Sequence, residues 1–157
     1  MEANLYFVPR SNNVEMYFRS SINEIAWVLS PENRDTIRTG AEAYVTAYRE
    51  ENLSEIKPNE KNAFISGTTS LAWGVLAPVH TAEEVPFWIN YSYLEAGKPY
   101  FMLHFTPARA KDDDSIFSPS VQVYFSPSQL SSFLDLLDQV YLESLVEELN
   151  TKAFTFE

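Results

Sequence analysis

Alternation of apolar and polar residues predicts β-strands over much of the chain. A period of two places every second side chain on one face of a sheet. Segments of strand character cover residues 5–8, 14–19, 63–77, 87–94, 100–106 and 121–125. We therefore expect an opening hairpin around Ser11-Asn12-Asn13 and a second hairpin over 87–106, in which Gly97 supplies a positive φ at the turn.

Two segments follow the helical period instead. Each opens with serine at the N-cap and proline at the first helical position, at Ser30-Pro31 and Ser126-Pro127. These patterns predict helices over about 31–51 and 127–150. The apolar stripe of the second helix consists of Leu130, Phe133, Leu134, Leu137, Val140, Tyr141 and Leu145. Gly40 weakens the first helix by about 1 kcal/mol relative to alanine, which favours close packing against a neighbour there.

The segment between the first two predicted strands and the first helix fits two structures. Ser21-Ile22-Asn23-Glu24 matches a capping box, which is typical of a helix start. Residues 25–29 also have the composition of a strand. Both interpretations stay open from the sequence.

Together these elements predict an α+β fold. We expect a strongly curved antiparallel sheet of about five to seven strands, with the two helices packed on it. Residues 1–157 form a single domain in this interpretation, with a short C-terminal tail over 151–157. A second group of apolar residues lies off the main stripe of the later helix, which predicts a homo-oligomer: Leu136, Leu142, Val146 and Leu149.

Composition narrows the class of protein. The 157 residues include no cysteine, which excludes a disulfide scaffold, cysteine–zinc modules and thiol catalysis. No apolar run approaches the ~20 residues of a membrane span, and the N-terminus lacks the pattern of a secretion signal. We expect a cytoplasmic protein (host cytoplasm if viral) with no membrane partner. The net charge is −11, and residues 112–157 hold Lys152 as their only basic residue against nine acids.

Catalytic motifs are scarce, so we expect a non-enzymatic protein without a metal or another cofactor. His80 and His104 lack the spacing of metal ligands. Four scattered glycines provide no phosphate-binding loop. Asp112-Asp113-Asp114 offers oxygen ligands for a hard cation, but a solvated turn is the favoured interpretation.

Aromatic residues make up 15% of the chain and suggest a different chemistry. On the hairpin over 87–106 both sheet faces carry large rings, so one face can be core while the other displays Trp88 and Tyr100. Exposed rings stack on unpaired bases with about 1–3 kcal/mol per base. The alternative interpretation is that both faces are covered, one by a helix and the other by a partner.

A family resemblance supports the nucleic-acid interpretation. Residues 87–140 run strand, Gly97-Lys98-Pro99-Tyr100 turn, strand, charged loop, strand and serine-capped helix. This order resembles the single-stranded-DNA-binding domain of the PC4-type transcriptional coactivators and the related Whirly proteins. The resemblance implies that Lys98, Tyr100, Met102 and His104 lie on or near a DNA path. An aspartate run replaces the basic loop of that family.

The chain is also similar in kind to small bacteriophage single-stranded-DNA-binding proteins. Those proteins pair an aromatic sheet with an acidic C-terminus that carries a terminal aromatic residue and recruits replication or transcription proteins. Residues 154–157, Phe-Thr-Phe-Glu, form a short version of such a tail.

The leading hypothesis is therefore a single-stranded-DNA-binding protein, a phage replication or transcription cofactor with an RNA polymerase or replication protein as partner. It requires the cations to converge beside Trp88, Tyr100 and His104. These cations are Arg10, Arg19, Arg34, Arg38, Arg49, Lys98, Arg109 and Lys111. The alternative hypothesis is an acidic protein-interaction protein, either an adaptor or a nucleic-acid mimic that inhibits a DNA-binding enzyme.

Overall fold

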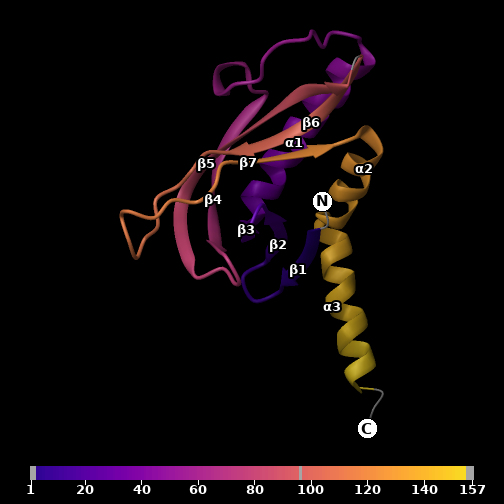
Figure 1. Cartoon of the computed structure of the whole chain (residues 1–157). Helices are drawn as coiled ribbons and strands as arrows, with labels where there is room; N and C mark the ends of the chain where they lie inside the picture. The colour runs from indigo at the N-terminus through magenta and orange to yellow at the C-terminus, as the bar shows by residue number, and fades with distance from the viewer. Residues whose placement is uncertain (1–2, 96, 155–157) are drawn as a thin grey trace.

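The computed structural model describes residues 3–95 and 97–154 and contains one antiparallel sheet of seven strands (Figure 1). The strands follow the order of the chain, so each one pairs with its sequence neighbour. They are β1 (Ala3–Val8), β2 (Asn13–Ser20), β3 (Asn23–Leu29), β4 (Ile65–Gly74), β5 (His80–Glu95), β6 (Lys98–Phe105) and β7 (Val121–Phe125). The predicted α+β fold with a curved antiparallel sheet is confirmed.

The helices are α1 (Pro31–Arg49), between β3 and β4, and α2 (Pro127–Leu136) and α3 (Gln139–Phe154) after β7. A 3₁₀ turn, η1 (Glu60–Asn62), precedes β4. None of the helices in the described part of the chain has both the length and the apolar character needed to cross a membrane.

One face of the sheet, the inner face, packs around α1. Trp27 of β3, Phe87 of β5 and Phe105 of β6 meet there with no exposed surface. Tyr44 of α1 lies on the same core, and its hydroxyl donates a hydrogen bond of 2.8 Å to the carbonyl oxygen of Pro99. Burial raises the pKa of Tyr44 to about 12. The inner face is therefore a continuous aromatic core that holds α1 in place.

At Gly40, α1 lies in close contact with the sheet. A Cβ atom built there would lie 2.8 Å from two side-chain carbons of Ile89 and 3.0 Å from a methyl carbon of Ile65. The predicted close packing at this glycine is confirmed.

The structure decides the conformation of residues 25–29 and corrects the end of the strand predicted over 63–77. Residues 25–29 belong to β3, because Ser21 adopts a φ of 57° that makes a tight turn after β2 rather than a helix start. The predicted strand to residue 77 ends earlier, at Gly74. A Cβ on Gly74 would lie 2.0 Å from the carbonyl oxygen of Ala77, so only glycine permits the turn that begins there.

The predicted single helix over 127–150 is wrong, because the chain breaks at Leu137 and Asp138 into α2 and α3. Asp138 caps the second helix: its carboxylate accepts a hydrogen bond of 3.1 Å from the backbone N–H of Tyr141. The break turns Val140 to solvent and buries Leu142 instead. The chain from 151 to 154, predicted as a tail, continues α3, while residues 155–157 lie outside the described residues.

The packing at Gly40 can be tested by adding one methyl group. Gly40→Ala gains about 1 kcal/mol in helix propensity but overpacks the contact with Ile89, at a cost of about 1–3 kcal/mol. We expect the free energy of unfolding, measured by urea denaturation, to fall by about 1 kcal/mol. Ile89→Val removes one of the two clashing carbons, so Gly40→Ala should cost less in that background. If Gly40→Ala raised the stability of both the wild type and the Ile89→Val variant, close packing at this position would be contradicted.

Candidate interaction surface

Trp88, Tyr100 and His104, which were predicted to bind DNA, do share one face, the outer face of β5 and β6. Trp88 pairs with His104 in the strand register, and their rings meet edge to face at 4.3 Å. Trp88 is only 6% exposed, however, and Tyr100 is partly buried further along the hairpin, opposite Ser92. The Nε2 atom of His104 lies 3.0 Å from the Ser120 hydroxyl, and burial lowers the pKa of His104. The rings therefore pack mainly on their neighbours.

The outer face is also covered further along β5. The side-chain nitrogen of Asn90, which is fully buried, donates to Asn62 Oδ1 at 2.6 Å and to the Asn59 carbonyl oxygen at 3.3 Å. The chain around η1 thus wraps the edge of β5 and reaches the outer face. Both faces are thus largely covered, as in the alternative interpretation of the aromatic hairpin, but this part of the outer face is covered by the chain's own η1 segment and not by a partner.

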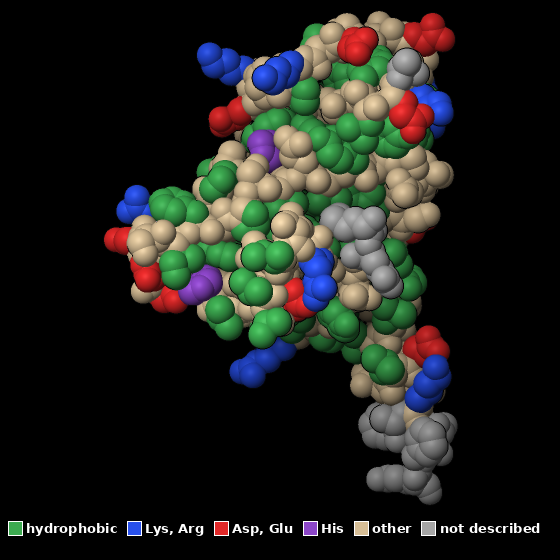
Figure 2. Space-filling model, in the orientation of Figure 1, with side chains coloured by type: hydrophobic (Ala, Val, Ile, Leu, Met, Phe, Trp, Pro, Cys, Tyr) green, Lys and Arg blue, Asp and Glu red, His purple; other side chains and the backbone are tan. Residues whose placement is uncertain are grey.

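The predicted DNA-binding cations are not gathered into one groove. They lie on the β1–β2 turn, β2, both halves of α1, the start of β6 and the β6–β7 loop. On the face shown in Figure 2, Lys and Arg side chains are spread over the molecule, and most of them lie near an acid. Five of the eight form ion pairs: Arg19–Glu24, Arg38–Asp138, Lys98–Glu95, Arg109–Asp114 and Lys111–Glu83.

Arg34 has a structural place instead of an exposed one. It is 5% exposed, and its guanidinium donates to the Asn12 carbonyl oxygen at 2.7 Å and to Gln139 Oε1 at 2.6 Å. Burial lowers its pKa. Arg34 therefore ties the β1–β2 turn to the start of α3. Arg10 and Arg49, by contrast, are exposed and form no ion pair with a described residue.

A group of exposed apolar side chains lies on two loops that connect strands of the sheet. We call it the loop-tip surface; it comprises Val75, Leu76 and Val79 of the β4–β5 loop and Phe117 of the β6–β7 loop. Leu76 is 89% exposed and Phe117 is 52% exposed. A hollow of about 500 Å³ lies among these residues and reaches Asn23, whose neighbour Ile22 is exposed as well.

The β6–β7 loop is built as a second hairpin, which fixes Phe117 in place. The backbone N–H groups of Ala110 and Ser118 donate to the carbonyl oxygens of Ile116 and Ala108, both at 2.8 Å. The guanidinium of Arg109 lies over the Phe117 ring at 5.6 Å from its centroid. The exposed ring thus sits on an ordered, hydrogen-bonded support.

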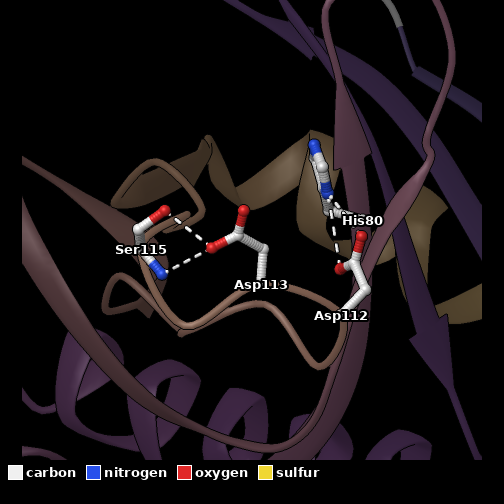
Figure 3. Close-up of polar contacts among 4 residues, drawn as sticks. All are labelled: His80, Asp112, Asp113 and Ser115. Atoms are coloured by element: carbon white, nitrogen blue, oxygen red, sulfur yellow. Dashed lines mark hydrogen bonds and ion pairs between the residues drawn. The ribbon is translucent and has the colours of Figure 1, made fainter.

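The same loop is attached to β5 beside the loop-tip surface (Figure 3). Asp112 and the imidazole Nδ1 of His80 lie 3.2 Å apart, and the backbone N–H of Lys111 donates to the carbonyl oxygen of Thr81 at 2.9 Å. These contacts place charged side chains of both signs beside the apolar residues of the loop-tip surface.

The three consecutive aspartates turn to three different partners. Asp112 faces His80, Asp114 lies 3.9 Å from Arg109, and Asp113 accepts two hydrogen bonds from Ser115. These hydrogen bonds lower the pKa of Asp113. In the described part of the chain, no three His, Cys, Asp or Glu side chains gather as a metal site. The geometry is that of a solvated turn.

The sequence did not predict the loop-tip surface, because Val75 and Leu76 fell in the predicted strand over 63–77 and Phe117 in a loop predicted to be charged. A signal was present: Val75-Leu76-Ala77-Pro78-Val79 is apolar throughout, although it lies between two strands where turn residues are usually polar. An apolar hairpin loop is typical of a binding surface.

Comparison with known proteins shows which family the chain resembles. A protein from Treponema pallidum (strain Nichols), described as an uncharacterized protein, is 27% identical over 151 residues. The match covers 96% of this chain and 54% of that protein, so the chain spans about half the length of this relative. No solved structure matches the chain significantly. The family model described as "Uncharacterised Treponema protein" matches residues 1–144, and the chain belongs to this family.

Proposed function

We propose that this protein is a non-enzymatic protein-interaction module that binds an apolar surface of a partner protein through the loop-tip surface. The observation that carries the proposal is the exposure of Leu76 and Phe117 on loops fixed by backbone hydrogen bonds. Large apolar side chains that gather on an ordered part of a surface are typical of binding sites.

The surroundings of the loop-tip surface favour a protein over a membrane. Both signs of charge lie around it, with Arg109 and Lys111 beside Asp112 and Glu83. An apolar centre with a polar rim is the usual arrangement of a protein interface. The net charge of −11 would also repel an anionic lipid surface.

This proposal takes up the interaction hypothesis, with a different part of the molecule as the binding site. The acids that motivated the mimic interpretation remain exposed on α3, for example Glu143 and Glu147. Single-stranded DNA as the ligand and self-association of the chain both stay predictions. They are separated from the present proposal by the two experiments below.

Site-specific photo-cross-linking in the native cells tests the loop-tip surface. A benzoylphenylalanine at position 76 is expected to cross-link to one discrete partner protein. The substitution Phe117→Asp should reduce the yield of that cross-linked product at least tenfold. The reason is that the new carboxylate would lose its hydration at the centre of an apolar interface without gaining an opposite charge. Position 140 is the matched control, since Val140 is also exposed but lies on α3. Both variants change exposed residues, so their stability should stay within about 0.5 kcal/mol of wild type.

Three results would contradict the proposal. They are equal cross-linking from positions 76 and 140, products that consist only of lipid, and products that consist only of a second copy of this chain.

Titration with fluorescent oligo-dT tests the DNA hypothesis directly. Because the cations are dispersed and five of them are ion-paired, we expect no saturable binding at about 150 mM salt. Fluorescence anisotropy at low and moderate salt is the measurement. Tight binding that weakens as salt rises, and that is lost in Arg10→Ala or Lys98→Ala, would replace our proposal with the DNA hypothesis.

A further inference from the structure

The last helix, α3, begins on the body of the molecule and then leaves it. Its first turn is held there, because Gln139 accepts a hydrogen bond of 2.6 Å from the Arg34 guanidinium and Leu142 is 3% exposed. The rest of the helix extends away from the sheet and from α1 (Figure 1). Every side chain from 147 to 152 is exposed. The outer half of α3 therefore presents its side chains to solvent.

An apolar stripe continues from the attached turn of α3 onto this exposed half. The residues of the stripe recur at spacings of three and four, which places them on one side of the helix: Leu142, Leu145, Val146 and Leu149. Leu142 belongs to the core, whereas Leu149 is 67% exposed. The core-facing side of α3 thus continues past the point at which the core ends.

The outer half of α3 lacks the packing that usually stabilises a helix. Isolated helices shorter than about 12–15 residues are marginal in water, and most helical stability in proteins comes from burial of an apolar side. The ion pair between Lys152 and Glu148 adds only about 0.3–0.5 kcal/mol. A surface that covers the apolar stripe would therefore stabilise this half of the helix.

The charges beside the apolar stripe favour one class of partner. Glu143 lies on one side of the stripe and Glu148 on the other, and α3 carries three glutamates against one lysine. A second α3 would bring two surfaces of the same net charge together, and an anionic lipid surface would be repelled as well. A helix with lysine or arginine beside its apolar residues would instead meet opposite charges on both flanks.

We propose that the apolar stripe of α3 binds an amphipathic helix of a partner protein, in which lysine or arginine flanks the apolar residues. Paired helices interlock side chains that recur at spacings of three and four, and the charges beside this seam select the partner. The bound helix would extend the core contact of Leu142 outward to Leu149. This proposal does not rest on the loop-tip surface, which is formed by loops of the sheet.

A helical peptide library displayed on phage is the probe, and the whole chain is the bait. Leucine is fixed at the a and d positions of a heptad repeat, and all other positions are random. We expect lysine and arginine to be enriched at e and g, where they would face the flanking glutamates of α3. No enrichment over an empty surface, or enrichment of acidic residues at e and g, would overturn the proposal.

Two substitutions on α3 separate docking from a general attraction to an acidic protein. Leu149→Asp and Val140→Asp each add one negative charge at an exposed position, and the two positions are two and a half turns apart, on opposite sides of the helix. The enriched peptide, labelled with a fluorophore, should bind at least tenfold more weakly to Leu149→Asp and no more weakly to Val140→Asp. Fluorescence anisotropy is the measurement. Equal affinity for the two variants would contradict docking on the stripe.

Hydrogen exchange and a charge exchange provide further readouts. Amides in the outer half of α3 should gain protection when the peptide binds, because the new contact stabilises that half. Glu143→Lys combined with Glu148→Lys should shift the selection from basic to acidic peptides. Unchanged selection, unchanged protection, or dimers that form through α3 without peptide and are lost in Leu149→Asp would each overturn the proposal. Phe117→Asp should bind the peptide normally, so failure here and failure of the loop-tip surface are distinguishable.

Discussion

The fold depends on one geometric constraint: α1, joined by the short helix α2 at the β7 end, must cover the inner face of a seven-stranded sheet. Seven strands spaced about 4.8 Å apart would span roughly 29 Å if flat, whereas a helix with its side chains is about 10–12 Å wide. The sheet therefore curves around α1, as Figure 1 shows. Gly40 allows the helix to lie close against Ile89 and Ile65 at the centre of that curve. Curvature also explains why β1 and β7, the ends of the strand order, border one groove.

The same constraint determines where the arginines of α1 lie. With the apolar side of α1 against the sheet, Arg34 and Arg38 face the β1–β2 turn and the junction of α2 and α3. Arg34 donates to neutral oxygen atoms, which satisfies its guanidinium without a buried carboxylate. Two cations that would serve a nucleic-acid groove are therefore used to attach the C-terminal helices. Arg34 and Arg38 thus hold the C-terminal helices in place, and a count of charges in the sequence does not reveal this structural role.

The elements were predictable where local chemistry decides them. The serine–proline starts at Ser30 and Ser126 produce the helices expected of them, and both capping boxes form. Tertiary contacts decided the rest. The break at Leu137 and Asp138 is favoured by the cap that Asp138 provides and by its pairing with Arg38, 100 residues earlier in the chain. A periodic pattern over 127–150 contains no information on that distant arginine, so it predicted one helix.

The candidate site was harder to predict than the fold, for a related reason. Exposure is a property of the assembled surface, and residues of the same apolar type occupy both the core and the loop tips. The DNA hypothesis required Trp88 to be displayed, but its neighbours enclose it, whereas Leu76 was expected in a strand and lies exposed in a loop. The apolar loop between Gly74 and His80 was the one local signal that distinguished the two outcomes. Loops carry function more often than strands do.

The large negative net charge of the chain has a physical role that follows from the position of these surfaces. A protein with an exposed apolar loop tip and two uncharged strand edges is at risk of aggregation. A large net charge opposes association of identical copies, because every copy carries the same sign. Exposed acids lie on α3 and in the β6–β7 loop, where Asp112 and Asp114 stand beside the loop-tip surface. The four residues of the loop-tip surface are themselves uncharged, and so are the described residues that line the groove bordered by β1, β7 and α2. The common negative charge therefore opposes contact between identical copies without placing a charge at the centre of either apolar surface.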